Sequence, residues 1–333
     1  MNLDNIFAKK EIWEEIECPI CDVQEKPSHY RDISSWEYKG VYKLSRCTKC
    51  GLIFQTPRIK NQYACLYYQS EKYWGVTLPH FSRRQVETKN NFQRYKQVYK
   101  RYQERKPGRM LDVGCGTGEF LDWFKCKGWE TVGTDISLKP LVYAKKTLGL
   151  EVIHGDLLEI DQRKKTFDLV STMHVFEHLY EPRKSLKKIS TILKDSGELI
   201  ITIPNHESLG RILFGASWFQ YQPGRHIFYY TPDTIKRMLS LCGFEVVDVD
   251  YWTKKDSLYS IYQSIRYTFS PKFRKSSEGG IASGDPKLAR VKREFSLTYE
   301  VSKGVASIIT ALIFVTEYFF GLSEVITVYA KKA

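Results

Sequence analysis

The chain has 333 residues, of which 42% are hydrophobic and 27% charged, a balance that excludes a disordered chain and suits a protein with a buried core. Its formal net charge of +13 favours acidic partners, but charge does not choose among nucleic acid, anionic lipid and a phosphate-bearing small molecule. Because MNLDNIFAKKEIWEEIECPIC at the N-terminus has no long apolar stretch and no small-residue cleavage site, we expect a cytoplasmic protein without a secretory signal.

Two pairs of cysteines near the N-terminus predict a structural zinc site. Cys18 and Cys21 form one CxxC pair, and Cys47 and Cys50 form the second. Four thiolates suit a tetrahedral zinc ion and leave no open coordination position, so this zinc would hold a fold and perform no chemistry. Free or redox-active thiols are the alternative. We expect a zinc ribbon over residues 1–60.

Residues 81–106 predict a helix with a strongly basic face. Its aromatic residues recur at helical spacing, at Phe92, Tyr95, Tyr99 and Tyr102. Such a stripe usually packs against a core, while a basic face that carries aromatic residues can also bind nucleic acid. We expect residues 61–106 to form a helical linker or lid.

From Pro107 onwards, strands alternate with helices, which is typical of a parallel sheet covered on both faces. The pattern predicts strands at 109–114, 130–136, 151–156, 167–175, 197–205 and 244–252, and helices at 120–128, 139–149, 182–194 and 231–243. The last helix has Thr231 as its N-cap, Pro232 at its first position and Gly243 beyond its end.

The stretch LDVGCGTGEFL, residues 111–121, predicts a turn that binds a ligand at the carboxyl edge of the sheet. Three glycines alternate in it, Gly114, Gly116 and Gly118. A dinucleotide fingerprint would have its third glycine where Glu119 stands, which argues against a pyrophosphate at the helix end. Asp135, at the end of the next strand, is placed to accept hydrogen bonds from both ribose hydroxyls of an adenosine.

With these residues, the sequence resembles the class I S-adenosylmethionine-dependent methyltransferases from about Arg109 to Trp252. LDVGCGTGEFL is similar to their first motif, VGTDIS to their ribose strand, HGDL to their adenine contact, and FDLVSTMHVFEHL to the segment that lines the methionine end. The N-terminal CPIC and CTKCGLIF make the chain similar to a bacterial subgroup that joins a zinc ribbon to this fold. Members of that subgroup commonly act on sugars, lipids or other metabolites of surface-glycan and secondary pathways.

The resemblance implies an α/β, Rossmann-like seven-stranded sheet, with S-adenosyl-L-methionine as cofactor. It places Asp112 and the three glycines at the methionine part, Asp135 at the ribose, and His174 near the methyl-bearing sulfur. Asp156 would lie beside the adenine, with a turn or helix cap as its alternative role. The full set of implied cofactor-binding residues is Asp112, Gly114, Gly116, Gly118, Asp135, Ile136, Asp156, Leu157 and His174.

Methyl transfer to a hydroxyl or an acidic carbon needs positioning and a general base, and histidine suits that role. His226 in QPGRHIFYYTP and His178 in HVFEHL are the candidate catalytic bases. A structural hydrogen-bonding role is the alternative for either. Tyr229 and Tyr230 either shape the acceptor pocket or pack in the core.

Two absent motifs lower the case for a nucleic-acid acceptor. Where enzymes that methylate a nucleobase amino group carry an Asn/Asp-Pro-Pro-aromatic tetrapeptide, this chain reads STMHVFEHL. Cytosine C5 methylation needs a thiolate near the fourth or fifth strand, and TIPN in the fifth strand has none. We therefore expect O- or C-methylation of a small-molecule, sugar or lipid-linked acceptor in polysaccharide or metabolite biosynthesis. The alternatives are an RNA methyltransferase that reads RNA with its zinc ribbon and basic helix, and a non-catalytic binding protein with this fold.

The apolar run at 304–322 has Glu317 as its only charged residue and is long enough for a membrane span. In the fold that the chain resembles, the sheet finishes with an antiparallel seventh strand between the fifth and the sixth, and SEVITVYAKK is the segment left for it. A single span would carry that strand to the far side of the membrane. We therefore expect a core at 107–253, a basic and apolar helical insertion at 254–322, and the final strand at 323–333. The insertion either packs on the domain or a second subunit of a homo-oligomer, or touches a membrane surface peripherally.

Overall fold

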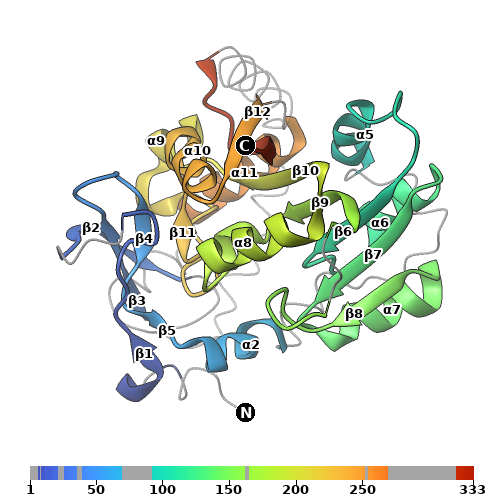
Figure 1. Cartoon of the computed structure of the whole chain (residues 1–333). Coiled ribbons are helices and arrows are strands. Elements are labelled where there is room, and N and C mark those ends of the chain that lie inside the picture. The colour runs from blue at the N-terminus through green and yellow to red at the C-terminus, as the bar shows by residue number, and fades with distance from the viewer. Residues whose placement is uncertain are drawn as a thin grey trace, which may run out of the picture.

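The computed structural model of the chain describes residues 7, 9–21, 26–35, 40–69, 92–161, 165–251, 254–268 and 320–333. Within these ranges the chain forms a seven-stranded central sheet, a four-stranded sheet near the N-terminus and a two-stranded ribbon (Figure 1). The expected division of the chain at residues 60, 106, 253 and 322 stays a prediction.

The central sheet has the strand order β12-β13-β10-β9-β6-β7-β8. Its strands are β6 (Arg109–Val113), β7 (Glu130–Asp135), β8 (Glu151–His154), β9 (Phe167–Met173), β10 (Leu193–Pro204), β12 (Phe244–Asp250) and β13 (Val325–Lys332). The strands from β8 to β10 pair in parallel, whereas β13 runs antiparallel between β10 and β12, with Tyr329 opposite Ile200. The expected place and direction of the last strand are confirmed.

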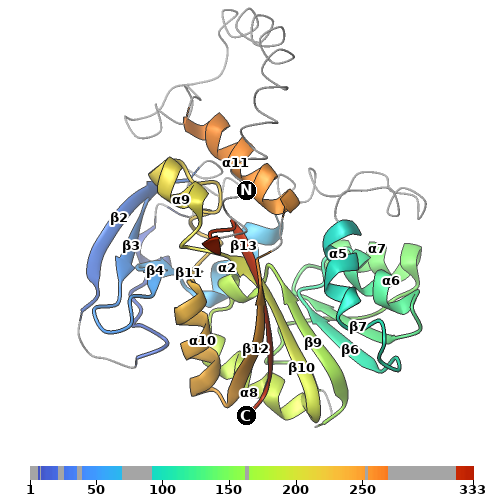
Figure 2. The ribbon, with the colours of Figure 1, turned by 90° about the horizontal axis from the view of Figure 1, so that it is seen from above.

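Helices cover both faces of this sheet, as Figure 2 shows. On one side lie α5 (Phe92–Lys100), α6 (Glu119–Lys125) and α7 (Leu138–Leu148), and on the other lie α8 (Pro182–Ile192) and α10 (Pro232–Leu241). Successive side chains of a strand point to opposite faces. On β10, Leu199 and Ile201 therefore join the core under α8 and α10, while Ile200 joins the core under α5 and α6.

The helix expected at 81–106 is shorter at its C-terminal end than the sequence pattern predicts. The described helix α5 ends at Lys100, and turns follow it before the chain enters β6 at Arg109. Tyr95 and Tyr102 are buried, and Tyr99 packs edge-on against Phe124 of α6. The three tyrosines of the aromatic stripe thus pack on the core. Residues 81–91 lie outside the described part of the chain.

The predicted start and end of the helix at 231–243 are confirmed in α10. Thr231 caps it by accepting a hydrogen bond at its hydroxyl from the backbone N–H of Thr234, at 3.1 Å, and Pro232 is the first helical residue. Gly243 follows the helix at φ +77°, a conformation that favours glycine.

The four-stranded sheet joins the N-terminal segment to a distant part of the chain. It consists of β2 (Ser28–Ser34), β3 (Val41–Arg46), β4 (Ile53–Gln55) and β11 (Phe228–Tyr229). The remaining N-terminal elements are η1 (Lys10–Ile12), β1 (Trp13–Glu14), β5 (Arg58–Ile59) and α2 (Asn61–Gln69). We call the elements from η1 to α2 the N-terminal module. The strand β11 follows the core strand β10 in sequence but pairs with β4, so this module and the core share one sheet.

The short helices α9 (Leu209–Phe214) and η3 (Gly215–Ser217) pack against α11 (Lys254–Thr268), which fills the first part of the expected insertion. The buried carboxylate of Glu324 ties this region to β13, because it accepts hydrogen bonds from the Gly210 N–H at 2.9 Å, the Trp218 indole at 2.6 Å and the Ser260 hydroxyl. Among the described residues, no helix is both long and apolar enough to span a bilayer. Residues 304–319 of the apolar run lie outside that part of the chain.

Candidate functional site

Gly116 presents bare backbone to open space just beyond β6. Its φ is +55°, and a Cβ atom there would meet no atom within 4 Å. Gly114 has a different need, since a Cβ at that position would lie 2.4 Å from Cγ2 of Val175. Gly114 therefore lets two loops pack closely, and Gly116 leaves room for a ligand to approach the main chain.

The carboxylate of Asp135 holds the glycine turn in place from the end of β7. Its Oδ2 accepts a hydrogen bond from the Gly116 N–H at 2.9 Å, and its Oδ1 accepts one from the Ser137 N–H at 2.7 Å. Burial raises the pKa of Asp135. A carboxylate has about four lone-pair sites, so capacity remains for hydroxyl groups such as those of a ribose.

Asp112, on β6, is buried and accepts a hydrogen bond from the Ser171 hydroxyl at 2.5 Å. Burial raises the pKa of this carboxyl to about 7, and the Ser171 hydrogen bond offsets only part of that effect. The Asp112 side chain is therefore buried near the end of β6, just before the glycine turn.

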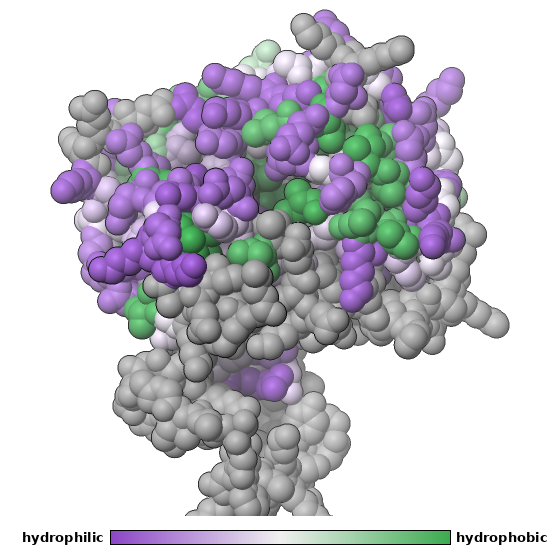
Figure 3. Space-filling model, turned by 90° about the horizontal axis from the view of Figure 1, so that it is seen from below, coloured by the Kyte–Doolittle hydropathy of each residue, from purple (hydrophilic) through white to green (hydrophobic). Residues whose placement is uncertain are grey.

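The predicted adenine side has one capping residue and several exposed apolar ones. Asp156 Oδ1 accepts a hydrogen bond from the Leu158 N–H at 2.8 Å, so its alternative role as a turn cap is observed. Leu157 is buried in the core, whereas Ile136, next to Asp135, is 40% exposed. Figure 3 shows apolar patches between hydrophilic ones on the side where α7 and β8 lie in Figure 1. An exposed apolar side chain beside the ribose-type carboxylate fits a flat aromatic base.

A buried carboxylate and three histidines meet beyond the end of β9. Glu177 lies in η2 (Phe176–His178), its side chain is 1% exposed, and neither carboxylate oxygen has a hydrogen-bond partner among the described residues. Its Oε1 lies 3.6 Å from Nδ1 of His174, 3.9 Å from Nε2 of His178 and 3.9 Å from Nε2 of His226. We call these four residues the Glu177 cluster.

The two predicted bases come together in this cluster although they are far apart in sequence. The Ile227 N–H donates to the Glu177 carbonyl at 2.9 Å, which brings His226 beside η2, and the rings of His178 and His226 are 4.7 Å apart. Burial lowers the pKa of His178 and lowers that of His226 well below its usual value, so both rings are neutral at pH 7. His174 has φ +57°, a left-handed conformation that is uncommon outside glycine and recurs at functional sites.

Sequence reasoning missed Glu177. The only available signal was its place between two histidines in HVFEHL, in the loop that the resemblance assigns to the methionine end. Tyr229 and Tyr230 pack in the core, which is one of their two expected roles. Both are fully buried, because β11 pairing with β4 directs Tyr229 into the core of the N-terminal sheet and Tyr230 into the main core.

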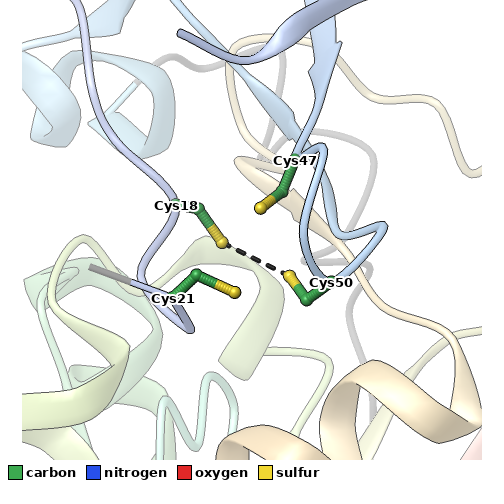
Figure 4. Close-up of side chains that lie close together, drawn as sticks. All are labelled: Cys18, Cys21, Cys47 and Cys50. Carbon is green, nitrogen blue, oxygen red and sulfur yellow. Dashed lines mark hydrogen bonds between the residues drawn. The ribbon is translucent and has the colours of Figure 1, made fainter. Parts of the chain in front are cut away.

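The four N-terminal cysteines converge as their spacing predicts (Figure 4). Their sulfur atoms all lie within 4.8 Å of one another, and Sγ of Cys18 is 3.5 Å from Sγ of Cys50. Backbone N–H groups of Cys50 and Lys49 outweigh the effect of burial and lower the pKa of Cys47 to about 7. Four convergent thiols fit the ligand set of a structural zinc ion.

The N-terminal module contacts His178 of the Glu177 cluster and the segment that carries His226. The Tyr68 hydroxyl, on α2, lies 3.0 Å from Nδ1 of His178. Gln55, at the end of β4, donates its backbone N–H to the Ile227 carbonyl at 2.8 Å and accepts from the Gly224 N–H at its side chain at 2.7 Å. Gln55 therefore forms hydrogen bonds to residues on both sides of His226 in the sequence.

Comparison with known proteins agrees with this geometry. Residues 85–249 match the family model described as a methyltransferase domain. Together with the order of the seven strands and the glycine turn beside Asp135, this match shows that the chain carries a class I S-adenosylmethionine-dependent methyltransferase domain.

Two curated relatives illustrate how far the similarity extends. A ubiquinone biosynthesis O-methyltransferase of Rhodopseudomonas palustris is 28% identical over 151 residues, which are 42% of this chain and 59% of the relative. An uncharacterised protein of Methanocaldococcus jannaschii is 35% identical over 118 residues, 35% of this chain and 50% of the relative. The chain thus spans between half and three fifths of the length of these relatives.

Solved structures are also similar to this chain. One is a SAM-dependent methyltransferase from Archaeoglobus fulgidus, with 23% identity, a TM-score of 0.45 and an alignment that covers 72% of this chain and 94% of that one. Another is a phosphoethanolamine N-methyltransferase of Haemonchus contortus, with 17% identity, a TM-score of 0.49 and coverage of 84% of this chain and 62% of that one.

Proposed function

We propose that this protein transfers a methyl group from S-adenosylmethionine to an oxygen or an acidic carbon of a small-molecule, sugar or lipid-linked acceptor in glycan or metabolite biosynthesis. The observation that carries the proposal is the Glu177 cluster. It follows β9 at the same sheet edge where Gly116 follows β6 and Asp135 ends β7, because parallel strands end at one edge. Cofactor residues and proton-handling residues are thereby neighbours.

The cofactor supplies a methyl group on a positively charged sulfur; the acceptor atom forms the new bond, the carbon–sulfur electron pair stays on sulfur, and the acceptor proton is released. On the protein side, Gly116 offers open main chain, Asp135 offers free lone pairs to the ribose, and Ile136 offers an apolar surface to the adenine. Asp112, Asp156, Leu157 and His174 stay proposed contacts of the same ligand.

Groups that take up a proton favour an oxygen or carbon acceptor, since an amine can attack with its own lone pair. His226 and His178 remain our proposed route for this proton, with Glu177 between them. The name of the Rhodopseudomonas palustris relative, a ubiquinone biosynthesis O-methyltransferase, supports a hydroxyl acceptor at low sequence identity. An RNA acceptor has less support, because the aromatic residues of the basic helix pack inside the protein.

We further propose that Cys18, Cys21, Cys47 and Cys50 hold one zinc ion whose role is to fix the N-terminal module. Through Gln55 and β11, that module positions the segment of His226. Zinc would thus act on catalysis through structure alone, in keeping with a closed four-thiolate site.

We propose a cytoplasmic location with peripheral contact to the membrane surface. Exposed apolar side chains on the touching helices α9 and α11 support such contact. They are Ile212, Leu213, Tyr259, Tyr262 and Ile265. A lipid-linked acceptor would be reached at that surface.

The test is incubation of the purified full-length protein with methyl-labelled S-adenosylmethionine and fractionated bacterial cell extract. We expect label in the lipid, polysaccharide or small-metabolite fractions, and none with the Asp135→Ala variant as control. Label confined to RNA would favour the alternative acceptor. No transfer to any fraction by protein that binds the cofactor would favour a non-catalytic binding protein.

A further inference from the structure

The Glu177 carboxylate is buried, and neither of its oxygens has a hydrogen-bond donor among the described residues. The guanidinium of Arg225, close enough to help lower the pKa of both neighbouring imidazoles, donates to Oε1 of Gln222 at 2.7 Å. Burying an unpaired carboxylate is costly, so a group without compensation indicates a missing cation or a proton.

In His178 and His226, the hydrogen bonds of the ring indicate which nitrogen carries the hydrogen. The other nitrogen has a lone pair and faces Glu177. Nδ1 of His226 lies 2.8 Å from the Gln220 carbonyl oxygen, and Nδ1 of His178 lies 3.0 Å from the Arg225 carbonyl oxygen. A carbonyl oxygen only accepts, so each Nδ1 carries the hydrogen. In the neutral ring, Nε2 is then bare, and in both rings it is the atom nearest Glu177 Oε1.

Three atoms with free lone pairs therefore lie close together with no hydrogen atom between them. They are Glu177 Oε1, His178 Nε2 and His226 Nε2. The ligand atoms of Glu177, His178 and His226 all lie within 4.8 Å of one another. The separation of 3.9 Å between each Nε2 and Oε1 is too long for a hydrogen bond. It is close to the spacing of about 3.4 Å between ligands of a tetrahedral ion with bonds of about 2.1 Å.

The geometry points to a divalent transition-metal site formed by Glu177 Oε1, His178 Nε2 and His226 Nε2. Two imidazoles and one carboxylate form a ligand set suited to ions such as Zn²⁺, Fe²⁺, Mn²⁺ or Co²⁺. Both Nδ1–H groups donate to backbone carbonyls, as the outer nitrogens of metal-bound histidines usually do. The site is distinct from the four cysteines.

His174 has a different role in the cluster. The Arg94 guanidinium, which can only donate, lies 2.8 Å from Nε2 of His174, so the hydrogen of this ring is on Nδ1. That nitrogen lies 3.6 Å from Glu177 Oε1. Because this nitrogen carries a hydrogen and has no lone pair to give, His174 is not a ligand, and it provides a matched control for the test.

Three protein ligands leave a coordination position open for the acceptor. This step rests on the proposed function: an acceptor hydroxyl in that position would lose its proton to water near pH 7, with the electron pair kept on oxygen, because a metal ion lowers the pKa of a bound hydroxyl. His178, whose side chain is 17% exposed, marks the side of the site that solvent reaches. With the ion bound, His178 and His226 would act as its ligands, and the ion would replace them as the group that activates the acceptor.

The test titrates Co²⁺ into chelator-stripped full-length protein and measures bound metal per chain together with the visible spectrum. We expect two ions per chain: one with intense thiolate-to-cobalt absorption and one without it. Glu177→Gln and His226→Asn should each lose the second ion and keep the first. His174→Asn and Glu181→Gln, which changes an exposed carboxylate, should keep both.

Uptake of a single ion by the parent protein, or of two ions by Glu177→Gln, would overturn the proposal. If His226→Asn fails to fold, as judged by circular dichroism, His178→Asn takes its place. Cofactor binding, measured by calorimetry on the stripped protein, separates the two proposals. If the parent protein binds two ions but no S-adenosylmethionine, only the proposed function is contradicted. If it methylates an acceptor with only the thiolate-bound ion present, only the metal site is contradicted.

Discussion

The hydroxyl of Tyr68 lies 3.0 Å from Nδ1 of His178, although the two residues are 110 positions apart in the chain. This contact joins α2 of the N-terminal module to the loop that carries Glu177. A second connection runs from Gln55 to Gly224, two residues before His226. The N-terminal module therefore holds both histidines that face the buried carboxylate, and its integrity should govern the geometry of the site.

Removal of the zinc ligands should loosen the site at a distance. In Cys47→Ser, we expect the loss of one zinc per chain and faster hydrogen exchange in peptides that cover β4 and residues 224–230, because these pair in one sheet. Exchange in β6 and β7 should not change. Mass spectrometry measures both zinc content and exchange.

Cys126→Ser is the matched control, because Cys126 is exposed and lies outside the cluster. It should retain its zinc and its exchange pattern. If Cys47→Ser loses zinc while residues 224–230 exchange as slowly as in the parent, the proposed structural link between zinc and His226 is wrong.

Asp135→Ala should abolish cofactor binding while the fold persists. The variant loses the acceptor for the Gly116 and Ser137 N–H groups and the proposed acceptor for two ribose hydroxyls. Hydrogen bonds to a charged group contribute about 1.5–3 kcal/mol each, so affinity should fall at least about 100-fold. Isothermal titration calorimetry with S-adenosylmethionine measures this loss.

Asp161→Ala, at an exposed position, controls for the loss of a carboxylate in the same domain, and circular dichroism confirms folding. Affinity of Asp135→Ala equal to that of the parent would show that the ribose assignment is wrong.

The sequence predicted the central sheet well because each of its signals is local. Glycines end three of the four predicted helices, and Thr231 caps α10. The apolar run from Leu199 to Ile203 has the composition of a strand buried on both faces. The resemblance predicted the place of β13, because one strand position in the sheet and one segment of the chain were still unassigned.

The Glu177 cluster and β11 depended on contacts that no local pattern reveals. β11 has only two residues, and its partner β4 lies in the N-terminal module. Glu177 is distinctive because it is buried without donors, which depends on the arrival of His226 through the Ile227 hydrogen bond. The sequence offered His178 and His226 as separate candidates, and only the fold places them on either side of one carboxylate.

Asp112 should make stability depend on pH. Its pKa is raised from an ordinary value near 3.8 to about 7, so the folded protein binds this proton more tightly than the unfolded chain. The stability that this proton contributes is fully present below about pH 3.8 and is lost as pH rises from there through about 7. Between pH 5 and pH 8 the free energy of unfolding should fall by roughly 2–3 kcal/mol through this group.

Asp112→Asn keeps an oxygen for the Ser171 hydroxyl but cannot titrate. Urea unfolding at pH 5 and pH 8 should therefore show that the variant gains stability relative to the parent as pH rises. Equal pH dependence of the two proteins would mean that Asp112 does not carry this proton.

The exposed apolar side chains of α9 should contribute to binding of anionic vesicles. Leu213 is 56% exposed, and its burial in a bilayer interface would contribute about 1.5–3 kcal/mol, whereas a glutamate there would oppose binding. We expect Leu213→Glu to weaken co-sedimentation with phosphatidylglycerol vesicles by about tenfold or more. Val41→Glu makes the same change of charge at a 62% exposed site on β3 and should bind as the parent does. Equal weakening by both variants would show that net charge, and not the face of α9, determines binding, and parent protein that stays in the supernatant would remove the proposed membrane contact.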